Sequence, residues 1–454
     1  MTAVGDISGT TTDRRAVISL LRRLRSPEGQ SNPWPVWEQM RSLGDVLPAP
    51  WGGYLVTGYD ACDQVLRGRN WLVPDLAWQA RQPPSERWQA PAAQAMSRTL
   101  FRLNAPDHTC QRRGLGNLFD RNTLASLAPR VAVHARRIVD ELADRIRDDG
   151  EADFVTVVGD QLPVLATGEW LDIPARHHAH MLDFTHRQVH SQELLPTKTE
   201  LAVSAQATEE MRVFFTGLIR ERREAPGDDP ISHWIRYWDE QFPGDPAAAD
   251  QTVFDLVMFI AVASLETSAT LMTNAVWLLT RDGGAAWNWL REHPEHVEDA
   301  VEETLRYDPP VHVNSRIAAA DTVLAGTPIA KDQMVHVMYG AAAHDPRRHE
   351  DPYRFDILRD SSHMAFGGGI HYCLGAGLAR LEGRSLLTAL LNRFQTLRPV
   401  SVPTYAPRMV FRRVTSLKVT TDDDPAAPRA PRPLAEDPAG PPAGGCPVHR
   451  TQRP

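Results

Sequence analysis

The sequence predicts a mainly α-helical protein with small β-sheets, and three observations support this fold class. Apolar residues recur at three-to-four spacing through several long segments, as they do in amphipathic helices. Segments with strand character are short and scattered. The longest apolar run, residues 253–279, is interrupted by Asp255 and Glu266, which favours a long buried helix over a membrane span. The length of 454 residues allows one large domain or several ordinary ones.

The individual elements follow from periodicity and from the positions of Pro and Gly. We predict helices at residues 130–148, 209–224, 253–279 and 294–308 and after Cys373, and strands within residues 53–58, 322–330, 334–340 and 416–421. After residue 421 the chain is rich in Pro, Ala and Gly and has almost nothing to bury, so this tail is expected to be disordered.

Composition argues against several classes of protein. The 49 basic and 57 acidic residues give a net charge of −8, and there is no long basic run, so nucleic-acid binding is not expected. The four cysteines are far apart and form no CxxC pair, so neither a disulfide framework nor a zinc ribbon is indicated. The N-terminus lacks the apolar segment of a signal peptide. We therefore expect a cytoplasmic protein without a membrane anchor.

An irregular segment between residues 71 and 103 combines Trp71, Trp78 and Trp88 with several prolines. A long loop with aromatic side chains suits either a surface patch or the roof of an apolar pocket. The sequence leaves both interpretations open.

The segment from Met364 to Gly377 contains Cys373 among five glycines. Such glycine density costs chain entropy unless the backbone passes close to something or adopts positive φ. The thiol lies just before a predicted helix, whose dipole is expected to lower its pKa and make it a nucleophile or a metal ligand. A Cys/His hydrolase using His371 and a zinc site are weaker alternatives, because residues two apart seldom face each other and no further ligands cluster.

Residues 366–375 match the F-G-x-G-x-H-x-C-x-G signature and so resemble the cytochromes P-450, the haem-thiolate monooxygenases. The resemblance implies that Cys373 is the thiolate ligand of the iron of haem b. It also implies that His371 points at a haem propionate, that Phe366 packs near the thiolate, and that Gly367 lets the backbone approach the sulfur.

Further motifs of this family occur in the expected order. Glu303 and Arg306 form an E-x-x-R pair, which alone indicates no more than a helical surface pair; by the resemblance, Arg354 would complete a buried structural network with them. The resemblance also places three side chains beside the haem propionates. These are Arg316, in the segment 310–335, and His108 and Arg112, in the segment 104–113.

The predicted long helix contains a segment similar to the family's A-G-x-[DE]-T-[TS] motif, at Ala263 to Ser268. The resemblance implies that Ala263 lies against the haem, that Thr267 organises water for oxygen activation and that Glu266 relays protons. From the residues alone, the pair could also hydrogen-bond to the preceding helical turn. Ser264 departs from the usual glycine, and its side chain could narrow the oxygen groove or add a hydrogen bond.

The resemblance covers about residues 30 to 420, so we expect one haem domain between an N-terminal extension, residues 1–29, and the tail, residues 421–454. By region it places the following residues in the substrate pocket: Trp78, Trp88, Val311, His312, Asn314 and Val410. His312 and Asn314 are expected to hydrogen-bond the substrate.

The implied function is oxidation of a small organic substrate, in secondary metabolism, with electrons from a ferredoxin and a ferredoxin reductase. Oxidative aromatic coupling, peroxide-driven oxidation and a non-catalytic haem protein are the alternatives.

Overall fold

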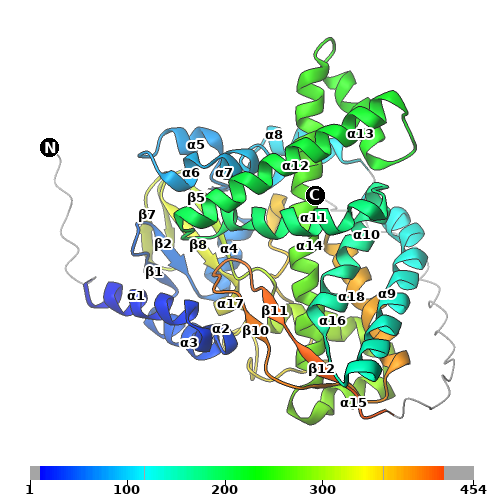
Figure 1. Ribbon diagram of the computed structural model, residues 1–454. Helices are drawn as coiled ribbons and strands as arrows, with labels where there is room; N and C mark the ends of the chain where they lie inside the picture. Colours follow the sequence, from blue (N-terminus) through cyan, green and yellow to red (C-terminus); the bar gives the residue numbers. More distant parts are fainter. Residues whose placement is uncertain (1–10, 117, 361, 424–454) are drawn as a thin grey trace, which may run out of the picture.

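The long helix α14 (Pro246–Thr280) runs through the middle of the molecule, with other helices packed around it (Figure 1). Its start is fixed locally, because the Asp245 side chain accepts a hydrogen bond from the Ala248 backbone N–H and Pro246 occupies the first turn. The computed structural model describes residues 11–116, 118–360 and 362–423.

Helices make up most of the described chain. Besides α14 they are α1 (Thr11–Arg25), α2 (Pro27–Ser31), α3 (Trp34–Leu43), α4 (Tyr59–Arg67), α5 (Leu76–Ala80), α6 (Glu86–Gln89), α7 (Pro91–Met96), α8 (Asp107–Gly114), α9 (Arg121–Asp149), α10 (Gln161–Leu171), α11 (His178–Gln188), α12 (Lys198–Glu224), α13 (Pro230–Gln241), α15 (Ala285–Glu292), α16 (Val297–Tyr307), α17 (Tyr339–Ala342) and α18 (Ala376–Arg393). Single 3₁₀ or π turns extend several of them, including Leu100–Arg102, Val189–Gln192 and Gly369–His371.

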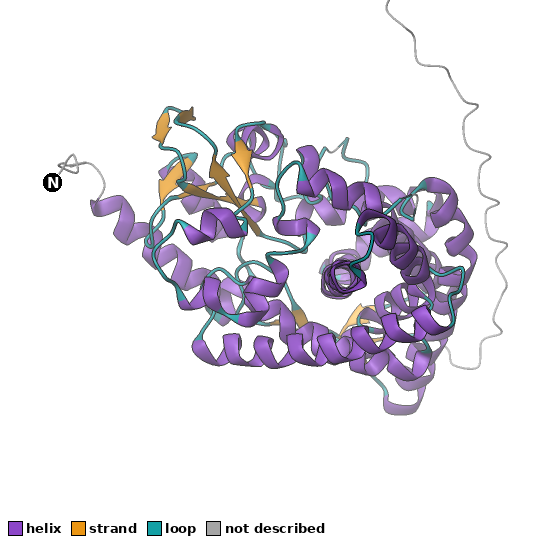
Figure 2. Ribbon diagram, turned by 90° about the horizontal axis from the view of Figure 1, so that it is seen from above, coloured by secondary structure: helices purple, strands orange, loops and turns teal. Residues whose placement is uncertain are grey.

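The strands form small sheets; most strands lie at one side of the molecule, and the others lie among the helices (Figure 2). The largest has the order β1 (Val46–Pro48), β2 (Tyr54–Val56), β8 (Met334–Met338), β5 (Val313–Ala318) and β3 (Trp71–Leu72), with β2 and β8 parallel and the other pairs antiparallel. The smaller sheets are β6 (Thr322–Leu324) with β7 (Thr327–Ile329), β10 (Thr404–Tyr405) with β11 (Val414–Ser416), and β4 (Ala152–Asp153), β12 (Lys418–Thr420) and β9 (Arg398–Pro399) in that order.

The core lies around α14. Within the described ranges, α14 is the one helix that is long and apolar enough to cross a membrane, but 78% of its most apolar window is buried inside the protein. Its buried side chains pack with those of α9, α10, α12 and α18 in a continuous apolar cluster. The length and apolar character of this helix are therefore explained by its central position.

The predicted helices and strands all occur, and α9, α12 and α14 are longer than the periodic patterns outlined. The segment 71–103, expected to be an irregular loop, contains β3 and the short helices α5, α6 and α7. The helix predicted at residues 130–148 is α9, extended at its start by Asp120, whose side chain accepts a hydrogen bond from the Thr123 N–H, and ended by Gly150 at φ 81°. The mainly helical fold class with small sheets is confirmed.

The expected domain boundaries stay predictions. Helix α1 falls within the stretch assigned to an extension, yet Val17 and Leu21 are buried in one cluster with Trp37 of α3. This helix is thus packed onto the body of the protein. Of the tail, residues 424–454 lie outside the described part of the chain.

Candidate active site

A large cavity lies between α14, α18 and the loop that carries Cys373. Its lining includes Ala263, Ser264 and Thr267 from α14, Leu378 from α18, and Phe366 and Cys373 from the loop. The cavity has a volume of about 1850 Å³ with its opening to solvent included. The lining is mainly apolar and includes one thiol, as in a site for a cofactor or an organic ligand.

The cysteine loop folds back on itself next to this cavity. The Cys373 backbone N–H donates to the Phe366 carbonyl at 2.9 Å. Gly367 and Gly369 have φ of 71° and 64°, in the region that favours glycine. A Cβ on Gly369 would lie 2.6 Å from the Leu66 carbonyl oxygen of α4. Gly367 lines the cavity, whereas Gly369 is needed for close packing against α4.

The Cys373 thiol differs from the sequence-based expectation in its acidity. Burial raises the pKa of Cys373, although the backbone amides of Gly375 and Ala376 and the guanidinium of Arg112 act in the opposite direction. The prediction of a lowered pKa is wrong, because desolvation outweighs the amide dipoles at the start of α18. A thiol in this position becomes a thiolate when a metal cation binds it.

Two histidines face each other at one edge of the cavity. The rings of His108 and His371 are 4.4 Å apart between centroids, and Nε2 of each is buried without a hydrogen-bond partner. Burial and the nearby Arg316 lower the pKa of His371 to about 2, and burial also lowers the pKa of His108. The pair is neutral and has unused hydrogen-bonding capacity directed at the cavity edge.

Two arginines join this edge. Arg112 donates to the backbone carbonyls of Ile370 and Tyr372 at 3.3 and 3.1 Å, and the buried Arg316 donates to the Ser315 carbonyl at 2.9 Å. Among the described residues, neither guanidinium forms an ion pair with a carboxylate. A buried cation without a counter-ion is costly, so the arrangement calls for an anionic group in the cavity.

The α14 wall presents two hydroxyl groups. Thr267 Oγ1 donates to the Ala263 carbonyl at 2.6 Å, which leaves its oxygen as an acceptor facing the cavity. Ser264 Oγ accepts a hydrogen bond from Thr167 Oγ1 of α10 at 3.1 Å and keeps its own proton to donate. The unusual serine thus adds a hydrogen-bonding group to the cavity wall.

Glu266 does not line the cavity. Its residue is 1% exposed, and its Oε1 lies 2.5 Å from Arg408 Nη1. Its Oε2 lies 3.6 Å from His186 Nε2, and Arg413, which binds Asp160 at 2.7 Å, lies 4.0 Å from Oε1. The acidic member of the predicted pair is therefore held in a buried ion network, while the alcohol member reaches the cavity.

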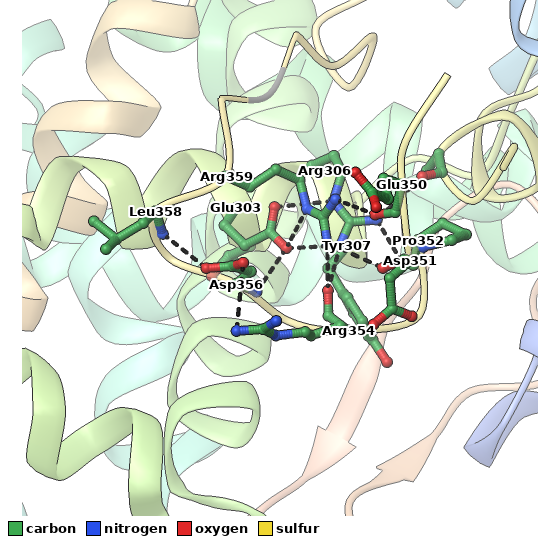
Figure 3. Close-up of polar contacts among 12 residues, drawn as sticks. Glu303, Arg306, Tyr307, Glu350, Asp351, Pro352, Arg354, Asp356, Leu358 and Arg359 are labelled. Atoms are coloured by element: carbon green, nitrogen blue, oxygen red, sulfur yellow. Dashed lines mark hydrogen bonds and ion pairs between the residues drawn. The ribbon is translucent and has the colours of Figure 1, made fainter. Parts of the chain in front are cut away.

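The structural network around Glu303 contains a different arginine from the predicted one (Figure 3). Glu303 Oε1 pairs with Arg306 Nη2 at 2.7 Å and with Arg359 Nε at 3.4 Å. The Arg354 side chain is 67% exposed and turns to Asp356 at 3.7 Å. Arg354 contributes only its carbonyl, which accepts from Arg306 at 3.2 Å and from Arg359 at 3.1 Å. The prediction for Arg354 is corrected to Arg359.

Three of the predicted substrate-pocket residues reach the cavity and three do not. Val311, Asn314 and Val410 line it. His312 turns away because its Nε2 contacts Asp308 Oδ1 at 3.2 Å in a buried pair. The expectation that His312 contacts the substrate does not fit this geometry.

The predicted aromatic roof is displaced as well. Trp78 is buried and its indole N–H donates to the Asp332 carbonyl at 3.1 Å, while Trp88 meets its ring edge-on at 6.0 Å. Neither tryptophan is part of the cavity lining; the neighbouring Arg87 and Arg102 are. Sequence reasoning missed these two arginines, although a charged residue within the apolar run "LFRL" was the available signal.

Sequence reasoning also missed Glu382 of α18. It is buried, and burial raises the pKa of Glu382 to about 8, which the hydroxyl of Ser268 only partly offsets. Ser268 lies on α14 and lines the cavity. A protonated carboxyl group therefore stands behind the cavity wall at neutral pH.

Comparisons with known proteins identify the family. The family model described as Cytochrome P-450 matches residues 291–418. The chain is 32% identical over 396 residues to 6-deoxyerythronolide B hydroxylase of Saccharopolyspora erythraea, covering 84% of this chain and 93% of that protein. It is 31% identical over 373 residues to the cytochrome P-450 monooxygenase PikC of Streptomyces venezuelae, covering 80% and 84%.

Solved structures with a similar sequence identity to this chain share its fold. The cytochrome P-450 enzyme CxnD, for C–S bond formation in chuangxinmycin biosynthesis, superposes with a TM-score of 0.75 at 27% identity, over 86% of this chain and 94% of that one. These similarities define a family of haem-thiolate enzymes. The chain belongs to the cytochrome P-450 family, and it is an oxidoreductase of the monooxygenase class.

Proposed function

We propose that this monooxygenase holds haem b through Cys373, takes electrons from a ferredoxin and its reductase, and oxidises a small to medium organic substrate of secondary metabolism with dioxygen. The observation that carries the proposal is one cavity lined by a thiol, a group of unpaired cationic side chains and the hydroxyl of Thr267. When bound, the haem supplies the redox-active iron for reducing dioxygen.

The residues present fit this cofactor. The Cys373 thiolate would hold the haem iron, and His108, His371, Arg112 and Arg316 would bind the two propionates. Support comes from the unused Nε2 atoms of both histidines and from the two guanidiniums without a carboxylate in the described chain. Charge-assisted hydrogen bonds to carboxylates would satisfy all of these groups at once.

Proton delivery in this proposal uses both faces of α14. Thr267 and Ser264 would position water in the cavity, one as an acceptor and the other as a donor. Glu266 would pass protons from behind, which requires its carboxylate to leave Arg408 for water. His186 contacts the same carboxylate and is partly exposed, so it offers a route from solvent.

The outer side of the cysteine loop suits an electron-transfer partner. Ile370 is 58% exposed, Tyr372 is also exposed, and the exposed guanidinium of Arg67 lies next to Gly368 of the same loop. An exposed apolar contact with Arg67 beside it, itself paired with Asp63, would suit a protein partner such as a ferredoxin. We place this exchange in the cytoplasm, consistent with the buried position of α14.

The relatives support a role in tailoring metabolites. They include a 6-deoxyerythronolide B hydroxylase and CxnD, an enzyme for C–S bond formation. We assign hydroxylation first. Because of CxnD, oxidative bond formation is kept as the alternative. The hydroxyls of Thr267 and Ser264, which favour handling of water and protons at the cavity, support hydroxylation.

The two reactions are separated by isotope labelling. The haem-loaded protein is supplied with ferredoxin, ferredoxin reductase, NADPH and ¹⁸O₂ against a library of apolar metabolites, and products are analysed by mass spectrometry. Hydroxylation adds one ¹⁸O atom to the product. Coupled or cyclised products without label would contradict the assignment, as would turnover with peroxide but never with the ferredoxin.

A further inference from the structure

The cavity contains more positive charge than a haem would neutralise. Four arginines line it, Arg87, Arg102, Arg112 and Arg316, and in the part of the chain that the structure describes none of them forms an ion pair. A haem b has two propionates. If these are bound by Arg112 and Arg316 as proposed above, two guanidiniums remain without a counter-ion inside an apolar cavity.

Arg102 is the more deeply buried of the remaining pair. It is 6% exposed, and in the described chain its side chain forms one hydrogen bond, a long contact of 3.4 Å to Gln192 Oε1. Its Cζ lies 4.7 Å from the Phe101 ring centroid and 5.7 Å from that of Trp88. Burial, together with Arg87 and Arg316, lowers the pKa of Arg102 to about 9, so the group is still charged at neutral pH.

Arg87 reaches the same place from α6. Its Nη1 donates to the Leu194 carbonyl at 3.1 Å, and its Nε is buried without a partner. Its Cζ lies 4.7 Å from the Trp88 ring centroid. Both guanidiniums therefore contact the Trp88 ring, although the ring itself is not part of the cavity lining.

The groups around this pair do not supply the missing negative charge. His336 is neutral, because Trp51 Nε1 donates to its Nε2 at 3.0 Å and its Nδ1 contacts Ser315 Oγ at 2.9 Å. Glu193 attracts Arg87 through space but forms no ion pair with it in the described chain, and the Glu193 oxygens accept backbone N–H groups of residues 409–411 at 2.9 to 3.2 Å. Two like charges held together in a low-dielectric site are unfavourable without an anion.

We infer that Arg87 and Arg102 form an anion subsite that binds the carboxylate of an otherwise apolar substrate. The walls next to the pair are apolar, with Met96, Leu100 and Leu194. Two guanidiniums offer several N–H donors to one carboxylate. The substrate is anchored at this end, and its apolar part extends into the space between the subsite and Thr267. This inference rests on the proposed function, because that function assigns the other two arginines to the cofactor.

The test compares carboxylates with their neutral amides on the haem-loaded protein. Equilibrium dialysis at neutral pH measures binding of decanoate against decanamide and of phenylbutanoate against phenylbutanamide. The wild-type protein binds at least one carboxylate about tenfold or more tighter than its amide. The double variant R87Q/R102Q loses this preference, while amide affinity stays within about twofold.

The matched control is Arg81→Gln, which removes an arginine of the same region whose side chain is exposed and paired with Asp332 outside the cavity. This variant keeps the wild-type preference. Arg102→Lys retains a cation and keeps part of it. Equal affinity for acid and amide in the wild-type protein, or an unchanged preference in R87Q/R102Q, overturns the inference, as does failure of both carboxylates to bind at millimolar concentration.

Haem content and the carbon monoxide difference spectrum are recorded for every variant. If Arg102→Gln loses haem and the acid preference is unchanged in the haem that remains, the guanidinium serves a propionate and the inference is wrong. If the wild-type protein shows no thiolate-haem spectrum, the proposed function fails instead. The two failures are therefore distinguishable.

Discussion

Arg408 Nη1 lies 2.5 Å from Glu266 Oε1, and this ion pair holds the carboxylate away from the cavity that Thr267 lines. Both side chains are buried, so each charge depends on the other. The acid and the alcohol of α14, adjacent in sequence, therefore have different environments. One belongs to a buried ion network and the other to the cavity wall.

Removing Arg408 is expected to destabilise the protein. Arg408→Leu leaves the Glu266 carboxylate buried without its main partner, which should cost about 3 kcal/mol of unfolding free energy. Urea unfolding followed by circular dichroism measures the loss. The control is Arg398→Leu, whose exposed pair with Asp422 should contribute less than about 1 kcal/mol. Equal effects of the two substitutions would contradict the description of the network.

The corrected arginine of the Glu303 network gives a second prediction. Arg359→Leu should lower the unfolding free energy by about 2–4 kcal/mol, because the side chain is only 12% exposed and pairs with a buried carboxylate. Arg354→Leu should change it by less than about 0.5 kcal/mol, because only its carbonyl takes part. Thermal unfolding and haem retention of both variants check this. A larger loss for Arg354→Leu would favour the sequence-based assignment.

Thr267 should matter for the outcome of turnover more than for binding. Thr267→Val keeps the shape but removes the acceptor oxygen from the cavity, so product formed per electron pair consumed should fall by about tenfold or more. Ligand affinity, measured by equilibrium dialysis, should stay within about twofold. Thr267→Ser retains a hydroxyl and should recover most of the yield. Unimpaired yield in Thr267→Val would remove this residue from proton handling.

Glu382 gives the stability a pH dependence of known sign. Burial raises the pKa of Glu382 to about 8, so the folded protein keeps a proton that the unfolded chain releases near its ordinary pKa of 4.5. Because the unfolded state binds fewer protons, the unfolding free energy falls as pH rises between these two values, by at most about 1.4 kcal/mol per pH unit from this group.

The matching variant is Glu382→Gln, which removes this titration. Urea unfolding across the same pH window should show a shallower decline for the variant than for the wild-type protein. Glu298→Gln, at an exposed carboxylate paired with Arg384, should leave the slope unchanged. Identical slopes for Glu382→Gln and wild type would show that Glu382 is ionised in the folded protein.

The fold could be predicted because its signals are local. The long run around Glu266 and the periodic segments before it fix the central helices, and glycine positions such as Gly367 reflect positive φ in the cysteine loop. Ala263 and Thr267 of the α14 motif both reach the cavity, because a helix places residues four apart on one face.

Partner choice could not be predicted, since it depends on side-chain direction between distant segments. Arg354 and Arg359 lie five residues apart in one meandering segment, and only the folded chain shows which guanidinium reaches Glu303. His312 is a polar residue in an apolar segment, but it pairs with Asp308, four residues earlier, and so does not face the cavity. The buried charge of Arg102 likewise depends on residues far away in sequence.

The central claim is that Cys373 ligates a haem, and one spectrum tests it most directly. The reduced, haem-loaded protein is mixed with carbon monoxide and its difference spectrum is recorded. The account predicts the strongly red-shifted Soret band of a thiolate-ligated haem in the wild-type protein, and its loss in Cys373→Ala. An ordinary haem–carbon monoxide band in the wild-type protein, or a red-shifted band that persists in Cys373→Ala, would contradict it.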